Sequence, residues 1–311
     1  MNNFVRIKVT SRSFSRHPIL KEELITIFPN CVFNPDGPET GLQNLEYFLS
    51  DADGLILGLE NIDRSIMEKN KNLKIIAKYG VGLDNIDLKA AEEFGIKIGW
   101  TGGVNKRSVS EQTLGFILGL NRNLFQSSND LKSGLWNKQG GAQLTQKCIG
   151  IIGCGNIGSD LVKLLQPFDV KILINDLVEK KELIKTYQCE QVDLKKLLKE
   201  SDIISLHTPL TEKTYHLVDS MFLNSMKNNA FLINTSRGKV VDQKALKNAL
   251  MKKIIFGAAL DVFESEPPVD LEFLGLPNLV VTPHIGGNAE EAVLGMGRSA
   301  ISHLRNYFLN D

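Results

Sequence analysis

The sequence contains few cysteines, no excess of charge of either sign and no long apolar run. Its four cysteines form no CxxC pair and no cluster with histidine, so we expect neither a metal site nor a disulfide framework. The 36 basic and 36 acidic residues cancel, which disfavours nucleic acid as a partner. No apolar run approaches the roughly 20 residues that a membrane helix needs, so we expect no membrane segment.

What is present is the composition of a globular protein, with 42% hydrophobic and 23% charged residues. At 311 residues the chain is long for a single hydrophobic core, which predicts two domains. Residues 4–9 alternate like a strand and lack the features of a signal peptide. We therefore expect a cytoplasmic protein.

Short apolar strands alternate with amphipathic helices along the chain, which predicts parallel α/β sheets. In the first hundred residues we expect strands at 5–9, 31–33, 55–58, 73–77 and 96–99. Helices are expected between them at 20–28, 43–49, 64–69 and 88–94. Asp63 and Asp87 are predicted N-caps of the last two helices. The pattern is typical of a small open α/β domain.

A second series of strands and helices starts at Lys147, after a long predicted helix at 107–120 and a glycine-bearing loop. Six strands are expected in it, at 148–152, 170–175, 203–206, 230–234, 257–260 and 279–281. Six is the number of strands in a full dinucleotide-binding sheet. One last helix, at 289–308, follows Gly286-Gly287.

A glycine turn joins the first strand of the second series to the helix that follows it. The segment Gly153-Cys154-Gly155-Asn156-Ile157-Gly158 has the spacing GxGxxG. Gly153 permits the tight turn, Gly155 leaves room for a pyrophosphate, and Gly158 lets the helix pack close to the strand. The amino terminus of the helix then offers free N–H groups to the phosphates.

An acid follows the next strand. Asp176 lies eighteen residues beyond Gly158, near the position of the carboxylate that binds the ribose hydroxyls of a dinucleotide. A glycine turn alone is a weak signal, but strand, turn, helix and acid together predict a dinucleotide site. An acid repels a 2′-phosphate, and no arginine follows Asp176, so NAD is favoured over NADP.

Three further polar side chains follow strands of the second series. Arg237 has the geometry to grip a carboxylate by two parallel hydrogen bonds. His284 can accept a hydroxyl proton during oxidation and return it during reduction. Glu266 would raise the pKa of a neighbouring imidazole and orient it, but Glu264 is a competing acid in the same loop. Taken singly, each of these residues is poor evidence for a site, because a surface ion pair or a loop contact would also account for it. The periodicity of the sequence does not show whether the three side chains lie close together in the fold.

At this point seven motifs, in order, resemble the D-isomer-specific 2-hydroxyacid dehydrogenase family, near its phosphoglycerate-dehydrogenase-like members. The resemblance runs from about Asp53 to Asn306. The motifs lie at 79–87, 105–111, 153–158 with Asp176, 207–210, 234–238, 259–263 with Glu266-Pro267, and 282–287.

The resemblance implies an enzyme that transfers hydride between NAD and a D-2-hydroxy or 2-keto acid. It implies that Arg237 clamps the substrate carboxylate, that His284 is the acid/base, and that Glu266 is the partner of the histidine. Glu266 matches the family pattern better than Glu264 because it directly precedes Pro267.

The resemblance also implies binding residues. Asp176 would lie on the adenosine ribose, Asp261 on the nicotinamide amide, and backbone N–H groups of the Gly80-Val81-Gly82 loop on the substrate carboxylate. The full implied set of cofactor-binding residues is Gly153, Gly155, Asn156, Ile157, Gly158, Asp176, Thr208, Ser236 and Asp261.

The implied fold is α/β with two open parallel-sheet domains. A Rossmann NAD domain, residues 102–287, would be inserted into a flavodoxin-like substrate domain formed by residues 1–101 and 288–311. The resemblance further implies a homodimer joined through the cofactor domains.

Departures from the family pattern bear on the substrate. Gly58 stands where phosphoglycerate-specific members commonly have an arginine, and Glu60 would oppose a phosphate. Arg64 and Arg107 are conceivable substitutes for the missing arginine. Gln112 stands where members of the family often have a histidine.

Several functions therefore stay open within and beyond this class. The substrate is 3-phosphoglycerate on one interpretation, and glyoxylate, hydroxypyruvate or another unphosphorylated acid on the other, with phosphite as a remote third. A non-catalytic NAD-sensing protein, like the corepressor relatives, is the alternative from a different class.

Overall fold

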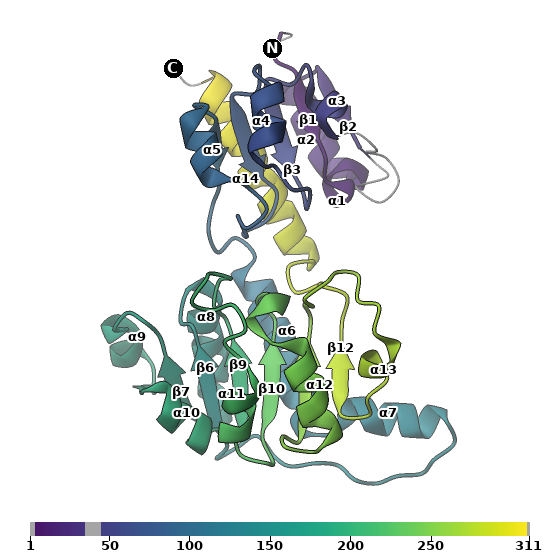
Figure 1. Cartoon of the computed structure of the whole chain (residues 1–311), viewed down its shortest axis with the longest axis vertical. Coiled ribbons are helices and arrows are strands. Elements are labelled where there is room, and N and C mark those ends of the chain that lie inside the picture. Colours follow the sequence, from purple (N-terminus) through teal and green to yellow (C-terminus); the bar gives the residue numbers. More distant parts are fainter. Residues whose placement is uncertain (1–3, 35–44, 310–311) are drawn as a thin grey trace. The chain divides into compact units, whose positions relative to one another are not determined.

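The computed structural model describes residues 4–34 and 45–309. The chain divides into two compact units. The first unit comprises Met1–Asn105 and Asn288–Asp311, and the second comprises Lys106–Gly287. Each unit contains one sheet of parallel strands with helices on both faces (Figure 1), which confirms the predicted α/β class with two parallel sheets.

The sheet of the first unit has the strand order β2-β1-β3-β4-β5, which is the order of flavodoxin-like folds. Its strands are β1 (Ile7–Val9), β2 (Cys31–Phe33), β3 (Gly54–Leu57), β4 (Ile75–Lys78) and β5 (Lys97–Gly99). Successive residues of a strand point to opposite faces. Accordingly Ile56 belongs to one hydrophobic cluster, and Leu55 and Leu57 belong to the other.

Helices cover both faces of this sheet. One face packs against α1 (Arg12–Arg16), α2 (Pro18–Ile27) and α14 (Glu290–Leu309). The other face packs against α3 (Leu45–Leu49), α4 (Arg64–Lys69) and α5 (Leu88–Glu93). The carboxy-terminal helix α14 belongs to the first unit because Ala300, Ile301 and Leu304 are buried in its core.

Local sequence signals explain several helix ends in this unit. The carboxylate of Asp63 accepts the Ile66 N–H at 3.0 Å, and that of Asp87 accepts the Ala90 N–H at 2.9 Å, which confirms both predicted N-caps. The five-residue helix α1 was not predicted. The predicted helix at 43–49 is observed from Leu45 onward, and residues 43 and 44 lie outside the described residues.

The sheet of the second unit has the order β12-β11-β10-β9-β6-β7-β8. Its strands are β6 (Cys148–Ile152), β7 (Lys171–Asn175), β8 (Glu190–Gln191), β9 (Ile203–Leu206), β10 (Phe231–Asn234), β11 (Gly257–Leu260) and β12 (Leu279–Val281). This is the dinucleotide-binding order with β12 added at one edge. The prediction of six strands was wrong by one, because β8 has only two residues and neither is apolar.

Two helical layers enclose the second sheet (Figure 1). One face packs against α6 (Lys106–Asn121) and α8 (Asn156–Leu165), and the opposite face against α10 (Leu194–Glu200), α11 (Ser220–Ser225) and α12 (Gln243–Met251). Ile149 and Ile151 of β6 are fully buried, and burying such a side chain contributes about 1.5–3 kcal/mol. The remaining short elements of this unit are α7 (Leu124–Lys132), η1 (Gln166–Phe168), α9 (Lys181–Thr186), η2 (Gly238–Val240) and α13 (Leu271–Leu274).

Because all strands of the second sheet run parallel, their carboxyl ends meet at one edge. The residues that follow β6, β7, β9, β10, β11 and β12 therefore gather there. In open α/β sheets ligands bind at this edge, where the strand order reverses. In the part of the chain that the structure describes, no helix has the length and apolarity required to cross a bilayer.

Candidate active site

The glycine turn follows β6 at this edge. Gly153 has φ +89°, and a Cβ atom there would lie 2.7 Å from the carbonyl oxygen of His207. A Cβ atom on Gly158 would overlap the carbonyl oxygen of Gly153. Glycine is therefore required at both positions. Gly155 faces open space, because a Cβ atom there would meet no other atom within 4 Å, so its backbone is accessible to a ligand.

Helix α8 begins at this turn without a side-chain cap. Its N-cap residue is Gly155, and Asn156, Ile157 and Gly158 form its first turn. An uncapped amino terminus leaves N–H groups available, and the helix dipole favours negative charge there. The turn and helix thus have the features of a phosphate-binding site.

Asp176 follows β7 and lies beside the turn. Its Oδ2 accepts the Cys154 N–H at 2.7 Å, and its Oδ1 accepts the Val178 N–H at 3.0 Å. Burial raises the pKa of Asp176, but these hydrogen bonds and Lys180 outweigh it, so the net pKa is lowered. The Nζ of Lys180 lies 3.3 Å from Oδ2, a contact that was not predicted although its i,i+4 spacing is visible in the sequence.

Two buried polar atoms at the end of β9 have no hydrogen-bond partner among the residues that the structure describes. They are Nδ1 of His207 and Oγ1 of Thr208, and His207 is only 8% exposed. Burial lowers the pKa of His207 to about 3, so the ring is neutral, and its Nε2 lies 2.9 Å from the Ser205 hydroxyl. An unpaired buried polar group costs about 1–3 kcal/mol, so such atoms commonly mark the place of a bound group.

These features together test whether the second unit fits NAD. The open backbone at Gly155 and the uncapped α8 suit a pyrophosphate, and the ionised Asp176 suits ribose hydroxyls. The unpartnered Thr208 hydroxyl adds a polar atom next to the turn. The residues present fit the dinucleotide.

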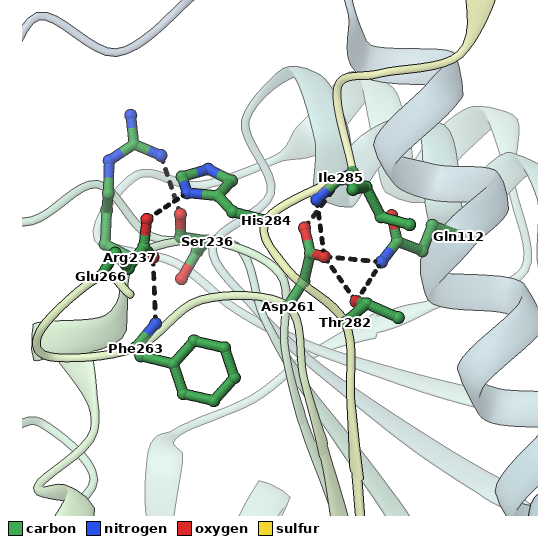
Figure 2. A network of polar contacts seen from close by, with 10 residues as sticks. Gln112, Ser236, Arg237, Asp261, Phe263, Glu266, Thr282, His284 and Ile285 are labelled. Atoms are coloured by element: carbon green, nitrogen blue, oxygen red, sulfur yellow. Dashed lines mark hydrogen bonds and ion pairs between the residues drawn. The ribbon is translucent and has the colours of Figure 1, made fainter. Parts of the chain in front are cut away.

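His284 and Glu266 contact each other directly. Nδ1 of His284 lies 2.6 Å from Oε2 of Glu266, and Oε1 of Glu266 accepts the Phe263 N–H at 3.0 Å (Figure 2). The hydrogen bond to Glu266 raises the pKa of His284 and outweighs the opposing effect of burial. Burial raises the pKa of Glu266, but His284, the Phe263 N–H and Arg237 lower it by more.

Arg237 lies beside this pair (Figure 2). Asn234 at the end of β10 shapes its segment by accepting the Ser236 N–H at 3.0 Å and donating to the Arg237 carbonyl oxygen at 2.9 Å. A Cβ atom on Gly238 would overlap the Phe263 backbone, so this segment packs directly against the loop that carries Glu266. The charge of Arg237 lowers the pKa of both Glu266 and His284 as a minor contribution. The structure therefore brings together all three candidate catalytic residues.

The backbone of His284 has an uncommon conformation. Its φ is +53°, and its N–H donates to the Asp261 carbonyl oxygen at 2.8 Å. Left-handed backbone at a non-glycine residue costs about 1–3 kcal/mol and persists only where surrounding contacts enforce it. The Asp261 carboxylate supplies such contacts by accepting the N–H group of Ile285 at 2.8 Å (Figure 2) and that of Gly286 at 2.8 Å.

Glu264, the competing acid, is engaged elsewhere. It lies 3.0 Å from Nε2 of His216 and accepts the Gln243 N–H at 2.9 Å, at the start of α12. His216 also has a positive φ, of +49°. The loop after β11 thus supplies one glutamate to each of two histidines, Glu264 to His216 and Glu266 to His284.

The first unit holds the remaining predicted substrate residues. The loop Gly80-Val81-Gly82 follows β4, and the Trp100 indole N–H donates to the Val81 carbonyl oxygen at 2.9 Å. The Nζ of Lys78 donates to the Gly58 carbonyl oxygen at 2.6 Å. Both carboxylate oxygens of Glu60 are buried and have no hydrogen-bond partner among the described residues.

The two arginines considered as phosphate ligands are paired with acids. Arg107 on α6 lies 2.9 Å from Oδ1 of Asp160, and Arg64 on α4 lies 2.7 Å from Oε2 of Glu93. Each guanidinium therefore already has a carboxylate partner within its own unit. Across residues 4–34 and 45–309, no group of three or more histidine, cysteine or acidic side chains could hold a metal ion.

Fold and site together define an NAD-linked oxidoreductase built on two parallel sheets. The family model "D-isomer specific 2-hydroxyacid dehydrogenase, NAD binding domain" matches residues 114–286, more than half of the chain. The chain belongs to the D-isomer-specific 2-hydroxyacid dehydrogenase family. It is an NAD-dependent 2-hydroxyacid dehydrogenase.

Individual relatives carry several substrate names. The chain is 41% identical to a hydroxypyruvate reductase of Thermotoga maritima over 241 residues, which cover 76% of this chain and 78% of the relative. It is 39% identical to a glyoxylate reductase of Thermococcus litoralis over 281 residues, 87% of this chain and 84% of the relative. A D-3-phosphoglycerate dehydrogenase of Methanocaldococcus jannaschii is 40% identical over 264 residues, 83% of this chain but 50% of the relative.

Solved structures resemble the whole chain. A D-lactate dehydrogenase of Aquifex aeolicus, complexed with NAD and lactic acid, has a TM-score of 0.87 at 27% identity. The match covers 97% of this chain and 95% of that one. This similarity confirms the family, the fold class and the cofactor predicted from the sequence.

Proposed function

We propose that His284, Glu266 and Arg237 carry out the chemistry of this dehydrogenase on a D-2-hydroxy acid and its 2-keto acid. The observation that carries the proposal is the 2.6 Å contact between His284 Nδ1 and Glu266 Oε2. It leaves Nε2 of the imidazole for the substrate and makes His284 the acid/base of the reaction. Bound NAD supplies the hydride acceptor in oxidation and the hydride donor in reduction.

The proton balance follows from the raised pKa of His284. In oxidation, Nε2 takes the hydroxyl proton as carbon 2 loses a hydride and becomes a carbonyl, so the neutral imidazole is needed. In reduction, the imidazolium returns that proton to the new hydroxyl oxygen. Because Glu266 raises the pKa of His284, the protonated form that reduction needs persists to a higher pH.

Arg237 binds the substrate carboxylate in this proposal. Its guanidinium lies next to His284, so a bidentate contact would orient carbon 2 and its oxygen toward the imidazole (Figure 2). The backbone of Gly80-Val81-Gly82 is also proposed to bind the substrate carboxylate.

The proposed cofactor residues lie at the carboxyl edge of the second sheet. Asp176 would bind the adenosine ribose, and Ser236 and Asp261 would line the nicotinamide end. Support comes from the ionised state of Asp176 and from the unpartnered Thr208 hydroxyl. The proposed set is Gly153, Gly155, Asn156, Ile157, Gly158, Asp176, Thr208, Ser236 and Asp261. We propose residues 102–287 as the NAD domain and residues 1–101 with 288–311 as the substrate domain.

We propose an unphosphorylated substrate such as glyoxylate or hydroxypyruvate. A buried carboxylate without a partner, such as that of Glu60, repels a phosphate and favours a neutral hydrogen-bond donor. Arg64 and Arg107, the conceivable phosphate ligands, are paired with acids. The relatives named for hydroxypyruvate and glyoxylate agree with this choice, and the one named for phosphoglycerate keeps the phosphorylated acid as the second candidate.

A substrate panel tests the proposal. NADH oxidation is followed with glyoxylate, hydroxypyruvate and 3-phosphohydroxypyruvate, and kcat/KM for the better unphosphorylated acid is expected to exceed that for the phosphorylated one by at least about 10-fold. Glu60→Gln removes the negative charge and is expected to narrow this ratio about 3- to 10-fold, through better use of the phosphorylated acid. Glu92→Gln, which removes an exposed acid in the same unit and keeps the Arg64–Glu93 pair, is the control and should leave the ratio unchanged.

Two outcomes of the panel would contradict the proposal. A preference for 3-phosphohydroxypyruvate would assign the phosphorylated substrate instead. Tight NADH binding with no turnover of any 2-keto acid would point to an NAD-sensing protein.

We also propose a homodimer formed through the second unit. Helix α7 has no buried residue, and it and the following segment expose large apolar side chains: Leu124, Phe125, Leu131, Leu135 and Trp136. Light scattering is expected to give twice the 34.5 kDa chain mass. Replacing Leu131 and Trp136 with aspartate should yield the monomer, whereas Met221→Asp, at an exposed apolar residue of α11, should not. A monomeric wild-type protein would refute this assignment.

The cytoplasm is the proposed location. All four cysteines are free, as is usual in a reducing compartment. Recovery of the native protein from a membrane or secreted fraction would contradict this assignment.

A further inference from the structure

The Asp261 carboxylate is buried and accepts hydrogen bonds from four donors among the described residues. Asp261 is only 1% exposed. Its Oδ1 accepts the Ile285 N–H at 2.8 Å, the Thr282 hydroxyl at 2.5 Å and the Gln112 amide at 2.9 Å. Its Oδ2 accepts the Gly286 N–H at 2.8 Å. A buried carboxylate needs such donors, and each of them here belongs to α6 or to the segment that carries His284.

Asp261 holds the segment on both sides of the candidate acid/base. Three consecutive N–H groups, those of His284, Ile285 and Gly286, donate to its carbonyl or carboxylate oxygens. These bonds enforce the left-handed conformation of His284 and so determine where its imidazole points.

Among the described residues, Gln112 is the donor to this carboxylate that comes from a helix. Its Nε2 donates to Asp261 Oδ1 and to the Thr282 hydroxyl, both at 2.9 Å, and Thr282 donates in turn to Asp261 (Figure 2). One turn earlier on α6, the Ser108 hydroxyl donates to the Gly286 carbonyl oxygen at 2.6 Å. Residues four apart lie on the same face of a helix, so α6 contacts the His284 segment at two successive turns.

We propose that Gln112 is a positioning residue for His284, which it holds and electrostatically tunes through Asp261. This inference rests on the proposed role of His284 as acid/base. The amide is uncharged over the whole working pH range, and it donates to a carboxylate whose negative charge acts on the imidazole. Gln112 thus keeps the His284 segment in place without adding a titrating group.

Three charged groups of the described residues act on His284. Glu266 contacts the ring, Asp261 lies behind its backbone, and Arg237 lies beside it. The negative charge of Asp261 raises the pKa of His284, and the positive charge of Arg237 opposes it. A donor to Asp261 partly offsets this negative charge, so removal of the Gln112 amide strengthens the influence of Asp261 on the imidazole.

Two substitutions at position 112 test the inference in opposite directions. Gln112→Met keeps the length of the side chain and removes its donor. It is expected to lower kcat for glyoxylate or hydroxypyruvate reduction about 10-fold and to move the alkaline limb of the pH profile up by about half a unit. Gln112→His restores a donor, and its imidazolium beside Asp261 is expected to recover much of kcat and to move the limb down.

Two controls separate positioning from general damage. Ser108→Ala removes the hydrogen bond from α6 to the Gly286 carbonyl oxygen but removes no donor to Asp261. We therefore expect kcat to fall without a shift of the pH profile. Glu111→Gln, at the exposed neighbour of Gln112, should change neither kcat nor the pH profile. NADH affinity, measured by fluorescence, is expected to change less than about 3-fold in Gln112→Met.

The inference fails if Gln112→Met keeps the wild-type kcat and pH profile. It also fails if kcat falls while the pH profiles of Gln112→Met and Gln112→His coincide with the wild type, because a merely structural contact would behave so. Failure of the proposed function is recognised separately, because His284→Asn would then stay active whatever happens at position 112.

Discussion

His284→Asn is expected to lower kcat for reduction of a 2-keto acid by about 10²–10⁴-fold, the range that general acid–base catalysis supplies. The amide cannot return a proton to the hydroxyl oxygen of the product. Asparagine tolerates a positive φ, so the backbone conformation at +53° is kept and the loss reports the missing imidazole. NADH binding, followed by fluorescence titration, should change little because the proposed cofactor residues are untouched.

The chain offers a matched control for this substitution. His216 also has a positive φ and also pairs with a glutamate, Glu264, at 3.0 Å. His216→Asn therefore makes the same chemical change in the same local setting. It is expected to keep kcat within about 3-fold of wild type, since surface substitutions away from a site have small effects. Equal losses in both variants would contradict the assignment of the acid/base to His284.

Arg237→Lys is expected to lower kcat/KM for glyoxylate by about 10²–10³-fold, which corresponds to roughly 3–4 kcal/mol of transition-state stabilisation. Lysine keeps the positive charge but loses the planar pair of donors that fits a carboxylate. Part of the loss should appear in KM, because the carboxylate is bound in the ground state as well.

An uncharged substrate separates this role from general damage. Glycolaldehyde lacks the carboxylate, so the wild type should use it poorly and Arg237→Lys should lose far less on it than on glyoxylate. Arg122→Lys serves as the control, because the Arg122 guanidinium contacts the Gly140 carbonyl oxygen on the surface. Equal proportional losses on both substrates would show that Arg237 does not bind the carboxylate.

Much of the fold could be predicted from residue patterns. Short apolar strands such as 148–152 are read directly from the sequence, because a buried parallel strand is apolar on both faces. Asp63 and Asp87 cap their helices through contacts three residues away, which the local sequence determines. Strand β8 was missed because a two-residue polar strand leaves no hydrophobic period. Helix α7 was missed although Leu124, Phe125 and Leu131 recur at helical spacing.

The candidate site was predicted in part. The spacing of glycines 153, 155 and 158 and of Asp176 is itself the signature of a dinucleotide site, so these residues could be predicted. In the structure, the Cys154 N–H of the glycine turn donates to Asp176 and holds it beside the turn. Lys180 and Gln112 were not assigned roles. The contact of Lys180 with Asp176 spans four residues, but polar residues at such a spacing are common on protein surfaces. The contact of Gln112 with Asp261 depends on how α6 packs against the loop after β11.

The sequence by itself determined the α/β class, the dinucleotide turn and, through the family resemblance, the identity of the three candidate catalytic residues. Local spacing suffices for these features because backbone geometry repeats over a few residues. The resemblance also implied that Glu266 is the partner of His284, but only the tertiary structure shows the two side chains in contact and pairs Glu264 with another histidine. His284 meets Glu266 across eighteen positions of the chain, His216 meets Glu264, and neither pairing follows from a local period. Packing of the loops after β10, β11 and β12 creates both contacts, together with the Asp261 network that holds His284 in place.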